Sequence, residues 1–221
     1  MTERYKRQVL HWGKEKQQQL EAATVLVAGV GGLGATVSQL LTRAGIGKLY
    51  LVDDGLVDWP DLNRQTLYAE TDIGQPKLVV AKKNLEQINS YVTIELLQQR
   101  IDAAFTCPVD VSLVADCLDN YSSRFLLEGT LPSGTFLVHG GIAGDQGQIL
   151  TLQKGRSQSL RELFAGSPQP QGDIPVTGAG AAIIASLMTN ELFQVVFGQP
   201  KLLNRFLVVG LSDLHLSFLD V

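Results

Sequence analysis

An α/β fold of the Rossmann type is predicted, in which a parallel βαβ nucleotide-binding half is followed by antiparallel strands in one mixed sheet. Three observations carry this prediction. A buried strand runs directly into a glycine-rich turn and a helix, strands and helices then alternate, and a glycine-rich segment at 140–147 favours a hairpin between two later strands. Of the 221 residues, 45% are hydrophobic and 18% charged, which is typical of one folded domain.

The first half of the chain shows the βαβ pattern. The apolar segment Thr24–Ala28 predicts a buried strand, and Gly32–Ala44 has apolar residues at helical spacing before Gly45 ends the helix. The strand Lys48–Val52 follows at once, so the two strands must be parallel. The alternation continues with a helix at 77–88, begun by Pro76, and with strands at 92–97 and 111–116.

The second half continues with helices and a hairpin. We predict a helix at 123–131, paired strands at 135–139 and 148–152, a long buried helix at 180–197, and strands at 205–209 and 215–219. Residues 154–177 include three prolines and are predicted to form a mobile loop, with one short helix capped by Ser159 and Glu162. The single domain then comprises an N-terminal helical arm (1–22), a nucleotide-binding half (23–120) and a second half (121–221).

The overall composition narrows the possible functions. A formal net charge of -4 disfavours a duplex-binding surface, so nucleic acid is not an expected partner. The sequence has two cysteines and no apolar run near its start, and its longest apolar stretch, Ala179–Met188, is shorter than a bilayer requires. We therefore expect a cytoplasmic protein without a membrane partner.

The segment from Gly29 to Gly34 satisfies the G-x-G-x-x-G pattern between the first predicted strand and its helix. Glycines let the backbone approach phosphates, and the N-terminus of the helix favours anionic groups. A carboxylate at the end of the second strand can accept hydrogen bonds from ribose hydroxyls. The candidate nucleotide-binding residues are therefore Gly29, Gly31, Gly32, Gly34 and Asp53. These residues do not distinguish NAD from ATP, so an NAD-binding oxidoreductase stays an alternative.

Charged residues after the later strands favour a triphosphate. The run Asp61-Leu62-Asn63-Arg64-Gln65 follows the second strand, Lys77 opens the next helix, and Asp119-Asn120 follows the strand at 111–116. In an open parallel sheet these points meet at the carboxyl edge. Two cations there suit phosphate groups, and a carboxylate suits Mg²⁺. We therefore predict that ATP and Mg²⁺ bind in this crevice.

These motifs resemble those of the ThiF, MoeB and HesA group, which is similar to the adenylation domains of ubiquitin-activating enzymes. The resemblance rests on Arg4 to Gln8, the glycine turn, Asp53-Asp54, Leu62 to Gln65, Gly74 to Lys77, and Asp119-Asn120. It implies that Asp53 holds ribose, that Arg64 and Lys77 hold the phosphates, and that Asp119 holds Mg²⁺. The same motifs add Asp61, Asn63 and Asn120 to the nucleotide site. The resemblance also implies a homodimer in which Arg7 reaches into the neighbouring subunit's site.

The activity implied by this resemblance is that of an adenylyltransferase. It would use ATP to activate the C-terminal glycine carboxylate of a small ubiquitin-fold carrier protein ending in Gly-Gly, bound by the half at 121–221. One alternative keeps ATP but activates a carboxylate on a modified tRNA nucleoside, and another is a non-catalytic carrier-binding protein. The pathway served, whether thiamine, molybdopterin or another, is left open.

Three features depart from the family pattern. The two cysteines, Cys107 and Cys117, cannot supply the four thiolates of a structural zinc site, so no such zinc is expected. The loop 154–177 has no cysteine for a thioester, which predicts adenylation without covalent handover. Asp61 stands where the family usually has Asn, and its charge would repel ATP unless Mg²⁺ or Arg64 compensates. His139 is interpreted as a core histidine bonded to backbone, rather than as a residue of the carrier-tail channel.

Overall fold

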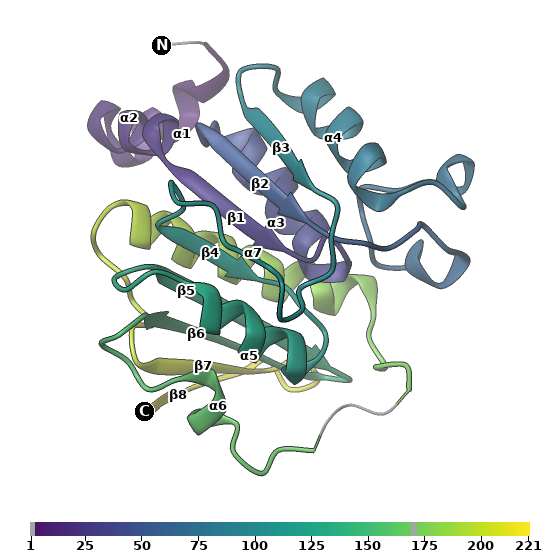
Figure 1. The fold of residues 1–221 in the computed structure, drawn as a ribbon. Helices are drawn as coiled ribbons and strands as arrows, with labels where there is room; N and C mark the ends of the chain where they lie inside the picture. Colours follow the sequence, from purple (N-terminus) through teal and green to yellow (C-terminus); the bar gives the residue numbers. More distant parts are fainter. Residues whose placement is uncertain (1–2, 169–171) are drawn as a thin grey trace.

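A computed structural model describes residues 3–168 and 172–221, and an eight-stranded mixed sheet runs through this part of the chain (Figure 1). The spatial order is β3-β2-β1-β4-β5-β6-β7-β8, in which β3 to β5 are parallel neighbours and β5 to β8 are antiparallel neighbours. The predicted mixed sheet is therefore confirmed. The strands are β1 Thr24–Ala28, β2 Lys48–Val52, β3 Thr93–Leu97, β4 Leu113–Asp116, β5 Phe136–Ala143, β6 Gln146–Gln153, β7 Arg205–Gly210 and β8 His215–Asp220.

The helices follow the predicted order. The helices are α1 Lys6–Trp12, α2 Lys14–Ala22, α3 Gly32–Ala44, α4 Lys77–Ile88, α5 Tyr121–Thr130, α6 Leu160–Leu163 and α7 Gly178–Val196, with 3-10 turns η1 Glu3–Tyr5, η2 Trp59–Asp61 and η3 Glu70–Asp72. Helices α1 and α2 both lie within the predicted N-terminal helical arm at 1–22, and Gly13 at φ 88° separates them. Ser159 and Glu162 form the predicted capping box of α6. Within the segment 154–177, residues 169–171 lie outside the described residues.

Helices cover both faces of the sheet. One apolar core lies between the sheet and α3, α4 and α7, while the other lies between the sheet, α5, α6 and the segment 98–112. Helix α7 is long and apolar enough, by length and composition, to cross a membrane. It nevertheless packs along α3 and across β5 and β6, with Ile184, Met188 and Leu192 fully buried. Its apolar composition is therefore explained by its place in the core.

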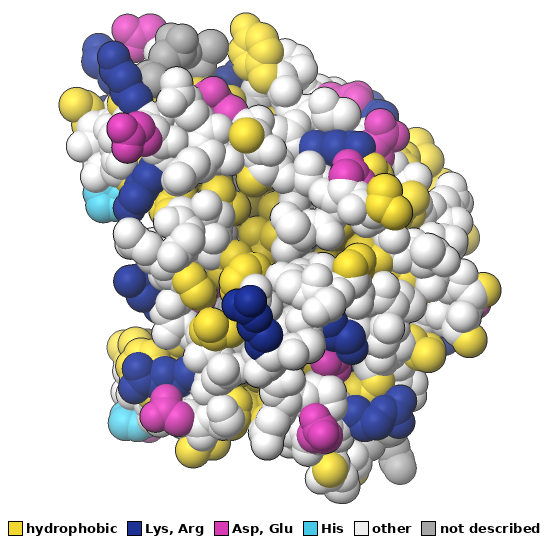
Figure 2. Space-filling view, turned by 60° about the vertical axis from the view of Figure 1, so that its left-hand side comes forward, with side chains coloured by type: hydrophobic (Ala, Val, Ile, Leu, Met, Phe, Trp, Pro, Cys, Tyr) yellow, Lys and Arg dark blue, Asp and Glu magenta, His cyan; other side chains and the backbone are white. Residues whose placement is uncertain are grey.

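The surface also carries apolar side chains. Figure 2 shows hydrophobic side chains gathered in the hollowed middle of one face, with Lys, Arg, Asp and Glu side chains around them. Among the exposed large hydrophobic residues are Leu10 on α1, Ile183 on α7 and Phe218 on β8. Apolar residues that are scattered singly over the surface are normal in a folded protein.

The strand order fixes where a ligand can bind. From β1 the chain moves outward to β2 and β3, and it then returns to place β4 and β5 on the other side of β1. The order of strands therefore reverses between β1 and β4. In open parallel sheets the crevice at such a reversal, at the carboxyl ends of the strands, is where ligands bind.

Candidate functional site

A large cleft opens at the reversal point. It has a volume of about 970 Å³ and is lined by residues that follow β1, β2, β3 and β4. The glycine turn forms part of its wall. The charged residues of the lining are Asp53, Asp54, Asp61, Arg64, Lys77, Arg100, Asp119, Arg124 and Asp173. The structure therefore brings all but one of the sequence-predicted charged residues to one cleft.

The glycine turn is shaped by close backbone contacts. A Cβ atom at Gly34 would lie 1.8 Å from the carbonyl oxygen of Gly29, so only glycine permits this packing of turn against helix. Gly29 itself has φ +86°, a left-handed conformation that favours glycine. The Tyr68 hydroxyl donates to the Val30 carbonyl at 2.8 Å and holds the turn from the other side. Burial, followed by the charge of nearby Asp53, raises the pKa of Tyr68, so this donor keeps its proton.

The start of α3 is open toward the cleft. Its N-cap is Gly31, and no side chain of the described residues caps it. Gly31, Gly32 and Leu33 line the cleft. The backbone N–H groups of an uncapped helix start are hydrogen-bond donors without partners in the helix, and the helix dipole adds positive potential. This end of α3 is therefore suited to a phosphate group.

Asp53, at the end of β2, is held by two backbone donors. Its Oδ2 accepts a hydrogen bond from Val30 N at 2.8 Å, and its Oδ1 accepts one from Gly55 N at 2.7 Å. The carboxylate thus fixes the glycine turn relative to β2. Each oxygen can accept a second bond, so the contacts are compatible with the predicted ribose role.

The two predicted phosphate ligands both lie near Asp61. Lys77 Nζ is 3.1 Å from Asp61 Oδ2, and Arg64 Nη2 is 3.9 Å from Asp61 Oδ1. The sequence predicts that Mg²⁺ or Arg64 compensates the charge of Asp61. In the structure the nearer cation is Lys77, because Asp61 ends the turn η2 opposite the start of α4.

Hydrogen bonds hold this group in place. Asp61 accepts from Gln65 Nε2 at 2.5 Å and from Asp58 N at 3.1 Å. Arg64 Nη1 donates to the Pro60 carbonyl at 2.6 Å and to Asn63 Oδ1 at 2.9 Å. Asn63, which the sequence placed in the nucleotide site, is an exposed residue of the cleft lining. Its amide orients the guanidinium of Arg64.

Asp119 and Asn120 lie between β4 and α5. Asn120 is the N-cap of α5, and its Oδ1 accepts a hydrogen bond from Ser123 N at 2.8 Å. Its Nδ2 donates to Asp119 Oδ1 at 3.1 Å, which orients the exposed carboxylate at the cleft. Asn120, which the sequence predicts in the nucleotide site, therefore caps α5 in the structure. Within the described ranges, no group of three or more His, Cys, Asp or Glu side chains could hold a metal ion.

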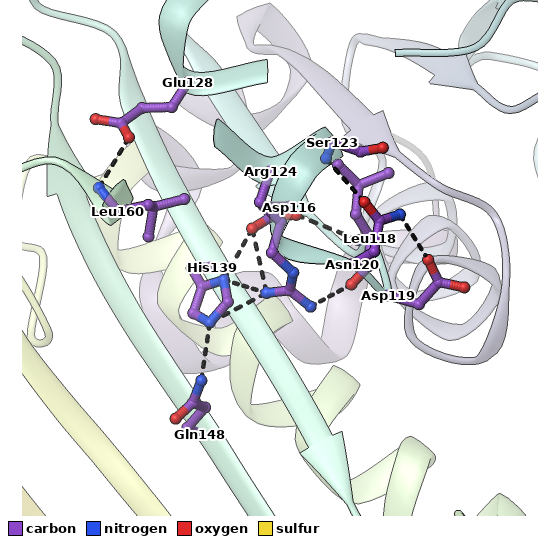
Figure 3. Close-up of polar contacts among 10 residues, drawn as sticks. All are labelled: Asp116, Leu118, Asp119, Asn120, Ser123, Arg124, Glu128, His139, Gln148 and Leu160. Carbon is purple, nitrogen blue, oxygen red and sulfur yellow. Dashed lines mark hydrogen bonds and ion pairs between the residues drawn. The ribbon is translucent and has the colours of Figure 1, made fainter. Parts of the chain in front are cut away.

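A buried charged cluster borders the cleft (Figure 3). Asp116, at the end of β4, lies beside His139 of the neighbouring β5, with its Oδ2 2.8 Å from His139 Nδ1. Arg124 Nη1 is 3.4 Å from the same oxygen and also contacts the imidazole, while Arg124 Nη2 donates to the Leu118 carbonyl. The interpretation of His139 as a core histidine is correct in its burial, but its partners are side chains rather than backbone.

Electrostatics fix the charge state of this cluster. Burial acts to raise the pKa of Asp116, but the charge of Arg124 and the hydrogen bond from His139 outweigh it and hold that pKa below its usual range. Burial, followed by the charge of Arg124, lowers the pKa of His139. The cluster therefore contains an ionised Asp116, a cationic Arg124 and a neutral His139 at neutral pH.

A smaller second pocket adjoins the cleft. It has a volume of about 250 Å³ and shares Asp119, Arg124, Ile142 and Ile174 with the lining of the cleft. Its remaining walls come mainly from the β5–β6 hairpin. Arg124 therefore lies where the two spaces adjoin.

One of the expected site residues lies outside the cleft. Arg7, on α1, is exposed, and the described residues that line the cleft do not include it.

Cys117 lines the cleft but is buried, and burial followed by the charge of Asp116 raises its pKa. Burial raises the pKa of Cys107 to about 11. Both thiols therefore stay protonated at neutral pH and are poor nucleophiles.

Sequence reasoning missed Arg100, Tyr68 and the pairing of Asp116 with His139. Arg100 follows β3, so its place at the carboxyl edge was available as a signal. The contact of Asp116 with His139 depends on β4 and β5 being neighbours in register, which the sequence does not state. Tyr68 lies on the connection between η2 and α4, whose path has no periodic pattern.

Comparisons with known proteins agree on one family. Residues 5–220 match the profile of the ThiF family. The chain is 34% identical to a sulfur carrier protein adenylyltransferase of Thermus thermophilus over 90% of this chain and 79% of the relative. It is also 34% identical to a molybdopterin-synthase adenylyltransferase of Salmonella typhimurium over 89% of this chain and 84% of the relative.

Solved structures share the fold. A structure of E. coli MccB with ATP superimposes with a TM-score of 0.84, covering 100% of this chain and 72% of that chain at 19% identity. A further structure, PaaA, superimposes with a TM-score of 0.79 at 20% identity, over 99% of this chain and 73% of that chain. At this identity the likeness concerns the fold.

Proposed function

Because the chain belongs to the ThiF family, we propose that it is an ATP-dependent adenylyltransferase that activates the C-terminal carboxylate of a small carrier protein. The observation that carries the proposal is the single cleft in which an uncapped helix start meets Arg64, Lys77 and Asp119. The names of the relatives support the same reaction class, since they are adenylyltransferases of sulfur carrier protein and of molybdopterin synthase.

ATP is the nucleotide that fits this lining best. The glycine turn and the N-terminus of α3 would receive phosphate, and Asp53 would accept hydrogen bonds from ribose. Arg64 and Lys77 supply two cations, and Arg100 is a third at the same cleft. A triphosphate needs this charge more than a dinucleotide does, which favours ATP over NAD.

The reaction joins two anions. The C-terminal carboxylate of a protein has a pKa of about 3.3–3.7 and is ionised at neutral pH, so it can attack the α-phosphorus without a general base. The bond to pyrophosphate breaks as the acyl phosphate bond forms, and pyrophosphate leaves with the electron pair. Arg64 and Lys77 lower the barrier by neutralising charge that grows on the phosphate oxygens.

Mg²⁺ would be held by Asp119 and by the phosphates of the substrate. This donor set fits, because Mg²⁺ is commonly bound by one or two carboxylates together with substrate phosphates rather than by a cage of protein ligands. When bound, the ion supplies charge neutralisation at the phosphates. Asn120 contributes by orienting Asp119.

The reaction is proposed to stop at the acyl adenylate. The loop 154–177 contains no cysteine, and the two thiols of the chain are buried and protonated. A thioester with the carrier needs an accessible thiolate. The adenylate is therefore passed to an acceptor that does not come from this chain.

A homodimer would complete the site. Arg7 is exposed on α1, beside exposed Leu10, and lies outside the cleft lining of its own chain. We propose that Arg7 enters the cleft of the partner subunit. Mixing the Arg7→Ala and Arg64→Ala variants tests this directly, because exchange of subunits then recreates one intact site per mixed dimer. Recovery of activity supports the contribution in trans, and no recovery in a verified mixed dimer contradicts it.

The proposed function is tested by ATP-pyrophosphate exchange. The wild-type chain is assayed against a panel of carrier proteins that end in Gly-Gly, with free amino acids and free carboxylic acids as controls. We expect exchange only with a carrier, and loss of exchange when the last glycine of that carrier is deleted. Exchange that is equally fast with free carboxylates, or that no carrier supports, would contradict the proposal.

A further inference from the structure

The second pocket has the position of an entrance to the cleft. A substrate carboxylate in the cleft must be followed by the rest of its chain, and the second pocket adjoins the cleft, with Asp119, Arg124, Ile142 and Ile174 in both linings. Its other lining residues include Gly141, Ala143 and Gly147. Small residues leave room for an extended peptide rather than for bulky side chains.

One polar side chain of this pocket is held by the buried cluster. Gln148, on β6, lines the second pocket, and its Nε2 lies 3.2 Å from His139 Nε2. Asp116 is ionised, so the 2.8 Å contact between its Oδ2 and His139 Nδ1 requires the proton on Nδ1. His139 Nε2 then has a lone pair that accepts hydrogen bonds, and Arg124 Nη1, 3.1 Å away, is a second donor beside the Gln148 amide.

The protonation of His139 fixes the amide of Gln148. Only the nitrogen of that amide can donate to His139 Nε2, so the oxygen must face away from the imidazole. Figure 3 shows this arrangement, with the amide nitrogen toward His139 and the oxygen turned away. Among the described residues, nothing donates a hydrogen bond to that oxygen. The pocket therefore contains an oriented acceptor without a donor.

A backbone N–H group is the donor that an extended peptide offers. We propose that Gln148 Oε1 accepts a hydrogen bond from a backbone N–H of the glycine-ended carrier tail, and that His139 and Asp116 are positioning residues that hold this amide. The inference rests on the proposed function and names the residue that binds the tail next to the reacting carboxylate. Arg124, at the junction of the two spaces, places positive charge on the path of that carboxylate.

Gln148→Leu is the test, and Gln146→Leu is its matched control. Gln146 lies two residues earlier on the same strand and also lines the second pocket, but it does not contact His139. The affinity for a carrier that the wild-type chain accepts is measured by calorimetry without ATP, and the KM values for carrier and ATP are measured by pyrophosphate exchange. We expect Gln148→Leu to weaken carrier binding by about five- to tenfold, the effect of one hydrogen bond, and Gln146→Leu to change it by less.

A modified carrier separates binding from a structural role. If the penultimate glycine is replaced by N-methylglycine through semisynthesis, the tail loses the N–H donor. The wild-type chain should bind this modified carrier more weakly than the ordinary carrier, by about the same factor by which Gln148→Leu weakens binding of the ordinary carrier. Gln148→Leu should bind the modified carrier at most about twofold more weakly than it binds the ordinary carrier. Gln148→Leu should also leave the KM for ATP unchanged. For the positioning role, His139→Gln should weaken carrier binding in the wild-type background but not in the Gln148→Leu background.

The outcomes distinguish this inference from the proposed function. If the wild-type chain shows no exchange with any carrier, both fail. If exchange is normal but Gln148→Leu binds the carrier as tightly as the wild-type chain, only the tail assignment fails. Equal sensitivity of the wild-type chain and Gln148→Leu to N-methylation would also overturn the assignment, because the N–H group would then be bound elsewhere.

Discussion

Asp61→Asn removes a negative charge from the phosphate side of the cleft. The side chains of Asp61 and Lys77 are 12% and 14% exposed and their charged atoms are 3.1 Å apart, so phosphate must compete with this carboxylate for the ammonium group. An ion pair of this kind contributes about 1 kcal/mol, the upper end for exposed pairs, which corresponds to roughly fivefold in affinity. We expect Asp61→Asn to bind ATP about fivefold more tightly.

The same substitution should lower stability. Asp61 accepts hydrogen bonds from Gln65 and from the Asp58 backbone, and asparagine offers one acceptor where the carboxylate offers two. The loss of one such bond corresponds to about 1 kcal/mol. Tighter ATP binding together with a lower Tm is therefore the expected combination.

Calorimetric titration with a non-hydrolysable ATP analogue and Mg²⁺ measures the affinity. Asp58→Asn is the matched control, because Asp58 caps the same turn through Trp59 N at 2.8 Å and lies outside the cleft lining. That control should leave the affinity unchanged. The reasoning is refuted if Asp61→Asn, with its fold verified by circular dichroism, binds the analogue no better than the wild-type chain, since Asp61 would then assist binding.

Three further predictions concern the glycine turn, the phosphate ligands and the buried cluster. Gly34→Ala would place a methyl group 1.8 Å from the Gly29 carbonyl oxygen, so it should lower the unfolding free energy measured by urea titration by more than about 3 kcal/mol. Gly129→Ala is the control, because its Cβ would lie in open space; it should leave the unfolding free energy unchanged or raise it by up to about 1 kcal/mol. Arg64→Ala should slow ATP-pyrophosphate exchange by on the order of 10²-fold, and an unchanged rate would remove Arg64 from the reaction. The pKa of His139 is lowered in the folded chain, so below about pH 6.5 the unfolded chain binds a proton that the folded chain does not, and stability falls as pH drops. His139→Gln should therefore flatten the pH dependence of the urea midpoint below about pH 6.5. An unchanged slope in this variant would contradict the assignment.

The parallel half of the sheet was predictable because its signals are local. Four elements have the bounds that the sequence predicts, because each apolar run is bounded by a glycine turn or a proline. They are Thr24–Ala28, Gly32–Ala44, Lys48–Val52 and Lys77–Ile88. Strand β5 extends to Ala143, beyond the predicted end, because the antiparallel ladder continues to the hairpin turn. Cross-strand pairing, which the sequence does not display, sets that boundary.

The sequence predicts which residues line the cleft better than it predicts which of them contact one another. The topological rule for parallel sheets placed Asp53, Arg64, Lys77 and Asp119 at one edge, and all four line the cleft. The partner of Asp61 was not predictable, because the direction of a 3-10 turn decides whether its carboxylate meets Lys77 or Arg64. The role of Gln148 depends on a buried imidazole on the neighbouring strand β5, and this contact has no signature in composition or spacing.

The tight turn between β5 and β6 has a consequence for specialisation. Ala143 pairs with Gln146, so the chain reverses within two residues, and no crossover helix lies between these two strands. The groups expected to handle the nucleotide precede β5, whereas the walls of the entrance belong mainly to one short ribbon. Specificity for a different carrier protein could therefore evolve by substitutions at a few positions of the β5–β6 hairpin, while the residues expected to bind the nucleotide remained unchanged.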